Sequence, residues 1–294
     1  MVPTRKFILT SLAMLAFAGN SLLCRFALKQ TSLDAASFTS IRLLSGALVL
    51  WLIVQMRPGA QRTGAGSWPS ALILFIYAAG FSFAYISLTA ATGALLLFGA
   101  VQVTMIGYGI WSGERLRAAQ LVGLALAFGG LVGLLIPGLS APPLVGSVLM
   151  LSAGVAWGVY SLRGRGAGDP TRVSAGNFLR AAPMALVLSL LTFQSASLNN
   201  NGVWYAVASG ALTSGIGYAL WYTVIPWLKA TQAATVQLSV PVLAAFGGIT
   251  FLGEHLTPRL GLASVAILGG IALVILERRP ASLPQPFTPA VPAD

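Results

Sequence analysis

The sequence predicts an all-α integral membrane protein, with ten transmembrane helices arranged as two inverted five-helix repeats around a central cavity. The first observation is composition: 56% of the 294 residues are hydrophobic and only 8% are charged, whereas a soluble domain carries about 25% charged residues. The other two observations are a series of long apolar runs and a weak internal repeat. A chain so poor in charge cannot cover a water-exposed surface, which disfavours a soluble protein.

Apolar runs of about 20 residues, the length that spans a bilayer, recur along the chain with turn-forming or polar segments between them. The intervening segments include RPGAQRTGAGS, IPGLSAPP and RGRGAGDPTR. Residues 280–294 are rich in proline and are predicted to form a disordered cytoplasmic tail. The predicted spans are 7–28, 35–56, 68–88, 91–112, 116–136, 145–163, 174–193, 203–224, 230–252 and 256–277.

The basic residues predict the orientation. Placing both termini in the cytoplasm leaves only Arg25, Lys29 and Arg259 in outer loops, while the inner loops and ends hold twelve basic residues. An excess of Lys and Arg marks the cytoplasmic side, so we expect a multi-pass protein of the bacterial inner membrane. Arg5 and Lys6 ahead of an apolar stretch also fit a signal peptide, but the first span has a counterpart in the second half and is expected to be retained.

The two halves of the chain share short similar stretches in the same order. IRLLSGALVLWL at 41–52 is answered by LRAAPMALVLSL at 179–190, and SGERL, with Glu114, is answered by LGEHL, with Glu254. The predicted repeats are 1–138 and 139–279. Because each repeat has an odd number of spans, the copies cross the membrane in opposite directions, an architecture of secondary transporters that alternate between two conformations.

Charged side chains in or near the spans are expected to have structural roles. Arg42 and Arg180 open the two similar runs, and we interpret both as anchors that snorkel to the headgroups. Binding of a substrate carboxylate is the alternative. Glu114 and Glu254 are expected to accept from backbone N–H groups at the start of the next helix.

The absence of catalytic and cofactor-binding motifs from the sequence reduces the number of possible functions. No predicted span has a carboxylate at its centre, and Cys24 and His255 are the only residues of their types. The sequence contains no catalytic triad, no metal-ligand cluster and no phosphate-binding loop. No cofactor or metal is therefore expected, and the net charge of +11 is spread over loops rather than gathered into a nucleic-acid patch.

Uncharged polar and aromatic residues inside the spans are the candidates for a substrate cavity. Aromatic walls with a few amides accept a flat apolar group and orient a polar end. Pro241 removes a backbone hydrogen bond and is expected to break the ninth span near Gln237. Helix packing for the aromatic residues, and contacts between helices for the amides, are the alternatives. The candidates are Asn20, Tyr77, Phe81, Tyr85, Gln102, Trp157, Tyr160, Tyr218, Tyr222, Gln237 and Pro241.

Two five-helix halves, each with a GE-x-L turn and a last helix that contains glycines, resemble the drug/metabolite transporter superfamily. More narrowly, residues 7–277 resemble its ten-helix EamA-type exporters, and among these a bacterial aromatic amino acid exporter. The first half departs from the pattern, since AVQVTMIGYGIWSGERL lacks the proline that precedes GEHL in the second half. The resemblance implies that the fifth and tenth helices lie apart from the cavity, where they could form a homodimer contact.

The sequence thus predicts a secondary transporter, not an enzyme, that exports small metabolites by alternating access. Aromatic or other apolar amino acids are the expected substrates. A carrier of broad specificity for drugs, nucleobases or sugar derivatives is the alternative, and a non-transport membrane scaffold is a third possibility of another class. The expected partners are the substrate and the lipid bilayer.

Overall fold

The computed structural model describes residues 3–56, 65–113, 118–136, 141–228, 233 and 236–276. Every regular element in these ranges is a helix, and no strand occurs among them. The long helices of the first half are α1 (Pro3–Gln30), α2 (Ala35–Gln55), α3 (Trp68–Tyr85), α4 (Ala90–Trp111) and α5 (Ala118–Leu135). Those of the second half are α6 (Leu144–Arg163), α7 (Pro170–Leu191), α8 (Asn200–Ala208), α9 (Gly217–Val224), α11 (Ser239–Leu252) and α12 (Pro258–Leu276).

One rod of the second half is irregular. α8 and α9 are joined by a π-helical segment, η2 (Ser209–Ile216), and a 3-10 turn, η3 (Ile225–Trp227), follows α9. A second 3-10 turn, η1 (Phe193–Ser195), lies between α7 and α8. Counting α8–η2–α9 as one rod, the described residues form ten rods. Their positions agree with the ten predicted spans, except that α11 covers only the last 14 residues of the predicted span 230–252.

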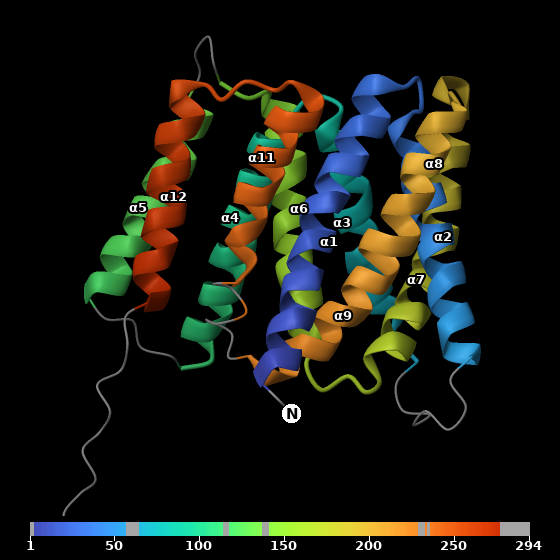
Figure 1. Cartoon of the computed structure of the whole chain (residues 1–294), viewed down its shortest axis with the longest axis horizontal. Coiled ribbons are helices and arrows are strands. Elements are labelled where there is room, and N and C mark those ends of the chain that lie inside the picture. The colour runs from blue at the N-terminus through green and yellow to red at the C-terminus, as the bar shows by residue number, and fades with distance from the viewer. Residues whose placement is uncertain are drawn as a thin grey trace, which may run out of the picture.

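The rods run up and down the bundle in alternation (Figure 1). α1 begins and α12 ends at the same side, which we call the N-terminal side (Figure 1). Six of the described helices are long and apolar enough to cross a membrane, and Trp68–Ala84, Ser239–Leu252 and Pro258–Gly270 are shorter apolar helices. The prediction of an all-α, ten-helix membrane protein is confirmed.

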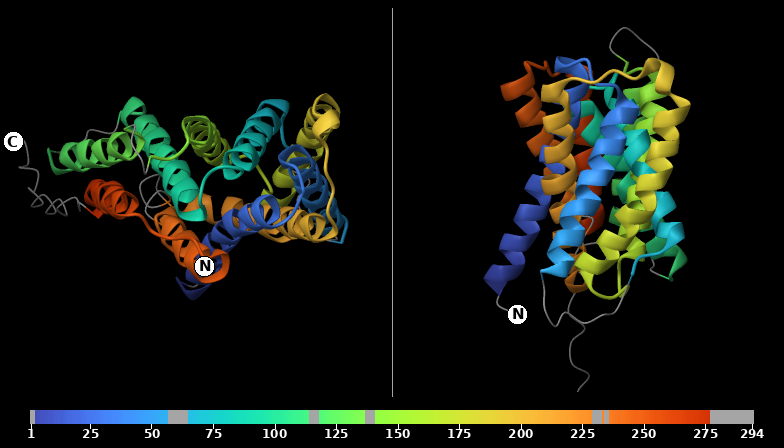
Figure 2. Two further views of the ribbon diagram at one scale, coloured as in Figure 1. Left: turned by 90° about the horizontal axis from the view of Figure 1, so that it is seen from above. Right: turned by 90° about the vertical axis from the view of Figure 1, so that its right-hand side faces the viewer.

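The helices of the two halves exchange neighbours. α3 and α4 of the first half both pack on α6, while α8–η2–α9 and α11 of the second half pack on α1. The remaining helices pair with their counterparts, α2 with α7 and α5 with α12. The α5–α12 pair stands at one end of the bundle, apart from α2 and α8 (Figures 1 and 2). Both halves therefore contribute helices to the middle of the bundle.

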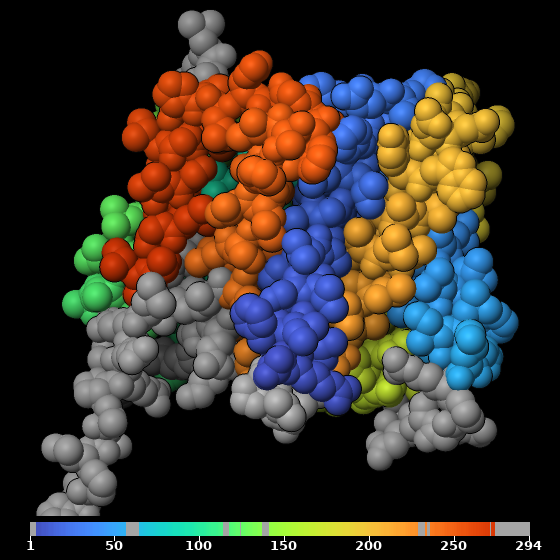
Figure 3. Space-filling model, in the orientation of Figure 1, coloured from blue at the N-terminus to red at the C-terminus, as the bar shows by residue number. Residues whose placement is uncertain are grey.

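The outer surface of the bundle is apolar. Leu262 and Val265 of α12 are each 75% exposed, and Phe128 and Val122 of α5 also face outward. The space-filling view shows α1 between α11 and the α8–α9 rod on one face (Figure 3). Such exposed side chains would be costly in water and are suited to lipid.

Several predictions fall outside the described residues or are untested by them. The boundary between residues 138 and 139, Glu114 and the tail 280–294 lie outside. The spacing of Gly129 and Gly133, two glycines four apart, predicts close helix contact, but a side chain at either position would meet no atom of the described residues within 4 Å. Gly130 instead lies against Ala266 and Ile267 of α12. The homodimer contact stays a prediction.

Polar side chains fix several helix starts. Asp34 caps α2, accepting from the Ser37 backbone N–H at 2.9 Å, and Asp169 caps α7 through the Arg172 N–H at 2.8 Å. Asp34 does more than cap, because its second oxygen accepts from the Ser197 N–H at 2.9 Å. This contact ties the α1–α2 connection to the segment before α8, and therefore joins the two halves at the side opposite the N-terminus.

Partial burial of the Asp34 carboxyl acts to raise its pKa, but the hydrogen bonds from Ser37, Ser197 and Ala36 outweigh it and hold the pKa below the ordinary value of 3.8. The stabilisation is therefore fully present above about pH 4, the pKa of the unfolded chain. It is lost as the pH falls through the lower pKa of the folded state.

We expect Asp34→Ala to lower the melting temperature of the purified protein in detergent at pH 7, because loss of such a cap costs about 1–2 kcal/mol. Asp169→Ala is the matched control and should cost less, since Asp169 caps only its own helix. The loss caused by Asp34→Ala should shrink as the pH is lowered toward 3. Equal losses at neutral and acid pH would contradict the role of the ionised carboxylate.

Candidate functional site

Aromatic rings from both halves meet in the middle of the bundle. We call this group the central aromatic cluster: Phe17, Tyr77, Phe81, Trp157, Tyr160, Tyr218 and Tyr222. Its shortest ring contact joins Trp157 of α6 to Tyr218 of α9, with centroids 4.6 Å apart. Tyr77 of α3 lies 5.1 Å from Trp157. All seven rings are at most 5% exposed, so in this conformation they pack against one another.

Asn20 is the polar centre of the contact between α1 and the π-helical segment. Its Nδ2 donates to the Tyr77 hydroxyl at 3.2 Å, and its Oδ1 accepts from the hydroxyl groups of Ser209 at 2.7 Å, Thr213 at 3.3 Å and Ser214 at 3.4 Å. In an α-helix, residues five apart point to different faces. The i→i+5 register of a π-helix instead allows Ser209 and Ser214 to reach the same amide.

The π-helical segment also lies very close to α2. A side chain at Gly210 would collide with the Arg42 carbonyl and the Ser45 hydroxyl, and one at Gly46 would collide with Phe178. Glycine at these two positions permits the close approach. The spacing of Gly210 and Ser214, two small residues four apart, is therefore used at this crossing.

Arg42 corrects a prediction. It is only 1% exposed and lies inside the bundle, so it is not an anchor at the headgroups. Its Nε donates to Ser214 Oγ at 2.8 Å, and its Nη2 donates to the hydroxyls of Tyr218 at 2.6 Å and Tyr77 at 3.2 Å. The hydroxyls available inside the bundle hold the guanidinium there, a result that hydropathy alone does not reveal.

Arg180 lies in the middle of α7, and its side chain reaches the segment that precedes α3, so its role as a headgroup anchor stays a prediction. Its Nη1 donates to the carbonyls of Ala65 at 2.6 Å and Gly176 at 2.9 Å. The guanidinium lies 6.0 Å from the ring centre of Trp68, the first residue of α3. The two arginines that occupy matching positions in the sequence thus have different surroundings.

Gln237 and Trp157 form a second polar contact beside the cluster. The Trp157 indole N–H donates to Gln237 Oε1 at 3.0 Å, and Gln237 Nε2 donates to the Ala233 carbonyl at 3.0 Å. The helix is interrupted at Leu238, and Pro241 lies in the first turn of α11, where its missing N–H costs nothing. The break lies near Pro241 as predicted, but it comes before the proline, which removes no hydrogen bond from the helix. Gln102 is buried in α4.

The cluster continues toward the N-terminal side through Tyr160 and Tyr222, which stack with centroids 5.1 Å apart. Tyr222 donates to the Tyr160 carbonyl at 3.0 Å, and the Tyr160 hydroxyl accepts from Asn177 Nδ2 at 3.2 Å. Asn177 Oδ1 in turn accepts from the Ser67 N–H at 3.0 Å. This chain links α6, α7 and α9 to the start of α3.

An ion pair joins α1 to the segment after α11 at the side of the bundle opposite the N-terminal side. Arg25 Nε lies 3.0 Å from Glu254 Oε1, and both residues are 7% exposed. Glu254 Oε2 accepts from the Ala90 N–H at 2.8 Å, while Arg25 Nη1 donates to the Tyr85 carbonyl at 2.8 Å. Glu254 therefore caps the start of α4 rather than that of the next helix, α12. Arg25 is buried within α1 and is not the outer-loop residue we predicted.

Tyr85 belongs to this side of the bundle. Its hydroxyl donates to the Ala90 carbonyl at 3.4 Å, and its ring lies 4.8 Å from that of Phe81. The predicted candidates thus divide among three levels of the bundle, with Tyr85 near the ion pair, Asn20 and Tyr77 in the middle, and Tyr160 and Tyr222 toward the N-terminal side.

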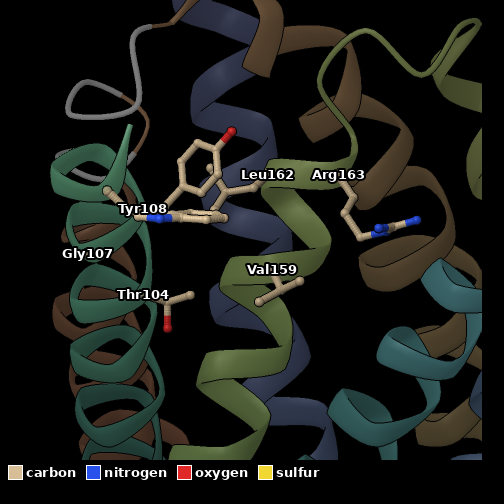
Figure 4. A pocket seen from close by; sticks show the side chains of 7 residues that line it. Thr104, Gly107, Tyr108, Val159, Leu162 and Arg163 are labelled. Atoms are coloured by element: carbon tan, nitrogen blue, oxygen red, sulfur yellow. The ribbon is translucent and has the colours of Figure 1, made fainter. Parts of the chain in front are cut away.

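A pocket of about 370 Å³ opens between the ends of α4 and α6 at the N-terminal side (Figure 4). None of the predicted candidates lines it, although Tyr160 and Gln102 lie in the same two helices. Thr104, Tyr108 and Trp111 recur at helical spacing, which places them on one face of α4 and is the sequence signal for this wall of the pocket. The lining residues are Thr104, Gly107, Tyr108, Trp111, Val159, Leu162 and Arg163.

Some residues of the centre were missed for identifiable reasons. Phe17 and Ser214 follow helical spacing from Asn20 and Tyr218, which would have placed them on the same faces. Ser209 depends on the π-helical register, which has no simple sequence signal. Among the described residues, no three His, Cys, Asp or Glu side chains are grouped so that they could hold a metal ion.

Comparisons with known proteins show which family and which relatives this chain resembles. The model of the EamA-like transporter family matches residues 144–276. An uncharacterized protein of Pseudomonas aeruginosa is 57% identical over 278 residues, covering 95% of this chain and 97% of that protein. The threonine/homoserine exporter RhtA of Escherichia coli is 32% identical over 157 residues, covering 52% of this chain and 53% of the exporter.

More distant comparisons extend along the whole chain. An uncharacterized transporter of Archaeoglobus fulgidus is 23% identical, covering 94% of this chain and 99% of that transporter. The crystal structure of another protein has a TM-score of 0.68 at 20% identity, covering 94% of this chain and 98% of that one, which shows that the fold is shared. The fold and these relatives define a multi-pass membrane transporter of small molecules, not an enzyme. The chain belongs to the EamA-like transporter family, within the drug/metabolite transporter superfamily.

We expect Glu254→Gln to destabilise the protein strongly, by about 3–5 kcal/mol, because Arg25 would be left as an unpaired buried charge. The measurement is the melting temperature of the purified protein. Replacing both residues, Arg25→Gln together with Glu254→Gln, should recover much of the loss. A double variant as unstable as the sum of the two single variants would show that the charge pairing is not the reason.

Proposed function

We propose that this protein exports aromatic or other apolar amino acids by alternating access between its two halves, with the central aromatic cluster as the substrate site. The main support is that the cluster is built by both halves: Tyr77 and Phe81 come from the first, and Trp157 and Tyr218 from the second. Rocking of one half against the other would part these rings. A flat apolar side chain could then replace ring–ring contacts with contacts of the same kind.

The polar groups around the cluster suit the other end of an amino acid. Asn20, Tyr77 and Tyr218 already exchange hydrogen bonds within it, and each can exchange its partner for a substrate atom. The threonine/homoserine exporter among the relatives supports amino acids as the substrate class. Its named substrates are smaller and more polar, and the aromatic walls here favour larger apolar ones.

The two ends of the bundle suit the two gates of such a cycle. Opening at the side opposite the N-terminus requires separation of Arg25 from Glu254 and of Asp34 from Ser197. At the N-terminal side, we propose that the pocket between α4 and α6 receives the substrate, with Trp111, Tyr108 and Arg163 at its walls. In this proposal the N-terminal side is cytoplasmic and the membrane is the bacterial inner membrane.

The test is efflux from liposomes that contain the purified protein. The liposomes are loaded with labelled phenylalanine, leucine, threonine, a nucleoside or a cationic dye, with and without a pH gradient. We expect phenylalanine and leucine to leave faster than from protein-free liposomes. Efflux of nucleoside or dye instead would favour a carrier of broader specificity, and efflux of none would exclude all the substrates tested, apolar amino acids included.

We expect Trp157→Leu to reduce the initial rate of phenylalanine efflux by about tenfold, because it removes a central wall of the site, equivalent to ~1.4 kcal/mol. Trp204→Leu is the matched control, since Trp204 is 71% exposed on α8. Both variants should elute as the wild type does on size exclusion. An unchanged rate for a well-folded Trp157→Leu would remove the cluster from the transport path.

A further inference from the structure

The guanidinium of Arg42 is a buried charge without a charged partner among the described residues. The one ion pair in these residues is that of Arg25 with Glu254, and the hydrogen bonds of Arg42 all go to neutral hydroxyls. We propose that Arg42 binds the carboxylate of the exported molecule, so that the substrate itself supplies the missing negative charge. This inference rests on the function proposed above and names the group that the site recognises.

Arg25 is an example of a buried arginine whose charge is paired with a carboxylate of the same chain. Arg25 has a carboxylate at 3.0 Å, and its other donor reaches two backbone carbonyls. Arg42 is buried more deeply, with 1% exposure against 7%, yet no carboxylate of the described residues pairs with it. An arginine in the interior of a membrane protein without a fixed counter-ion is characteristic of a binding or transport site.

The guanidinium retains donor capacity for a ligand. Its Nη1 is buried and has no hydrogen-bond partner among the described residues, while Nη2 is shared between the hydroxyls of Tyr77 and Tyr218. Arginine binds carboxylates through two parallel N–H groups. A carboxylate could take Nη1 and Nη2 together, and the two tyrosine hydroxyls, free to rotate, could then donate to it.

The surroundings of the charge also select what is attached to the carboxylate. The guanidinium carbon lies 5.0 Å from the ring centre of Phe81 and 5.2 Å from that of Tyr77. Trp157 and Tyr218 lie immediately beyond Tyr77. A carboxylate bound at Arg42 would therefore carry its apolar part into the central aromatic cluster, which matches an aromatic or large apolar amino acid.

The experiment compares labelled L-phenylalanine with labelled L-phenylalaninamide in liposomes containing the wild-type protein, with protein-free liposomes as the blank. The two molecules share the ring and the amino group, and the amide lacks the carboxylate. We expect efflux of the amide to be at least about tenfold slower, since a charged hydrogen-bond partner is lost. Equal efflux of the acid and the amide would overturn the role of Arg42 and leave the proposed export of apolar amino acids intact.

Variants of Arg42 make the assignment specific. Arg42→Lys keeps the charge but loses the paired donors, so it should slow phenylalanine efflux, and Arg42→Gln should remove the preference for acid over amide. Arg180→Gln is the control, because the hydrogen bonds of Arg180 within the described residues go to the backbone carbonyls of Ala65 and Gly176, and it should keep the preference. A folded Arg42→Gln protein that keeps the preference would overturn the inference.

The remaining outcomes are also decisive. If Arg42→Gln does not fold, the comparison of acid and amide in the wild type still decides. If the wild type moves neither phenylalanine nor its amide but does move a nucleoside or a dye, the proposed function fails, and the carboxylate assignment fails with it.

Discussion

The positive charge of Arg42 is the constraint around which the centre of this protein is arranged. A guanidinium inside a membrane-spanning bundle is costly unless polar groups surround it. Ser214, Tyr77 and Tyr218 meet that need from three different helical segments. Ser214 reaches it from the π-helical segment, and the missing side chain of Gly210 allows that segment to approach the backbone of Arg42. The irregular helix and the close contact with α2 are thus connected with one buried charge.

The same segment connects the charge to the aromatic cluster. Asn20 takes hydrogen bonds from Ser209 and Ser214 and donates to Tyr77, whose hydroxyl also bonds Arg42. Movement of α1 relative to the α8–α9 rod would therefore disturb the charge, the amide and the rings together. This shared network gives the proposed cycle a physical coupling, because a ligand that replaces Tyr77 or Tyr218 at Arg42 also changes the contact between the halves.

Particular residues show how far prediction from sequence reached. The predicted candidates Tyr77, Trp157 and Tyr218 do meet, because each lies on the face of its helix that is buried in the bundle. Arg42 is a charge in an apolar run, and the prediction that it lies at the headgroups is wrong. Snorkelling and burial cannot be distinguished from the run itself, since the hydroxyls that stabilise the buried form lie as far away in the chain as Ser214. Glu254 was similarly expected to cap the next helix and instead caps α4.

The sequence by itself determined the ten membrane spans, the alternation of their direction and the chemical types available at the centre. These follow from hydropathy and run length, which are local properties of the chain in a lipid solvent. Only the tertiary structure decided which arginine is paired and which is not, and where the pocket between α4 and α6 opens. These depend on the rotation of each helix about its axis and on the π-helical register, which are set by neighbours remote in sequence.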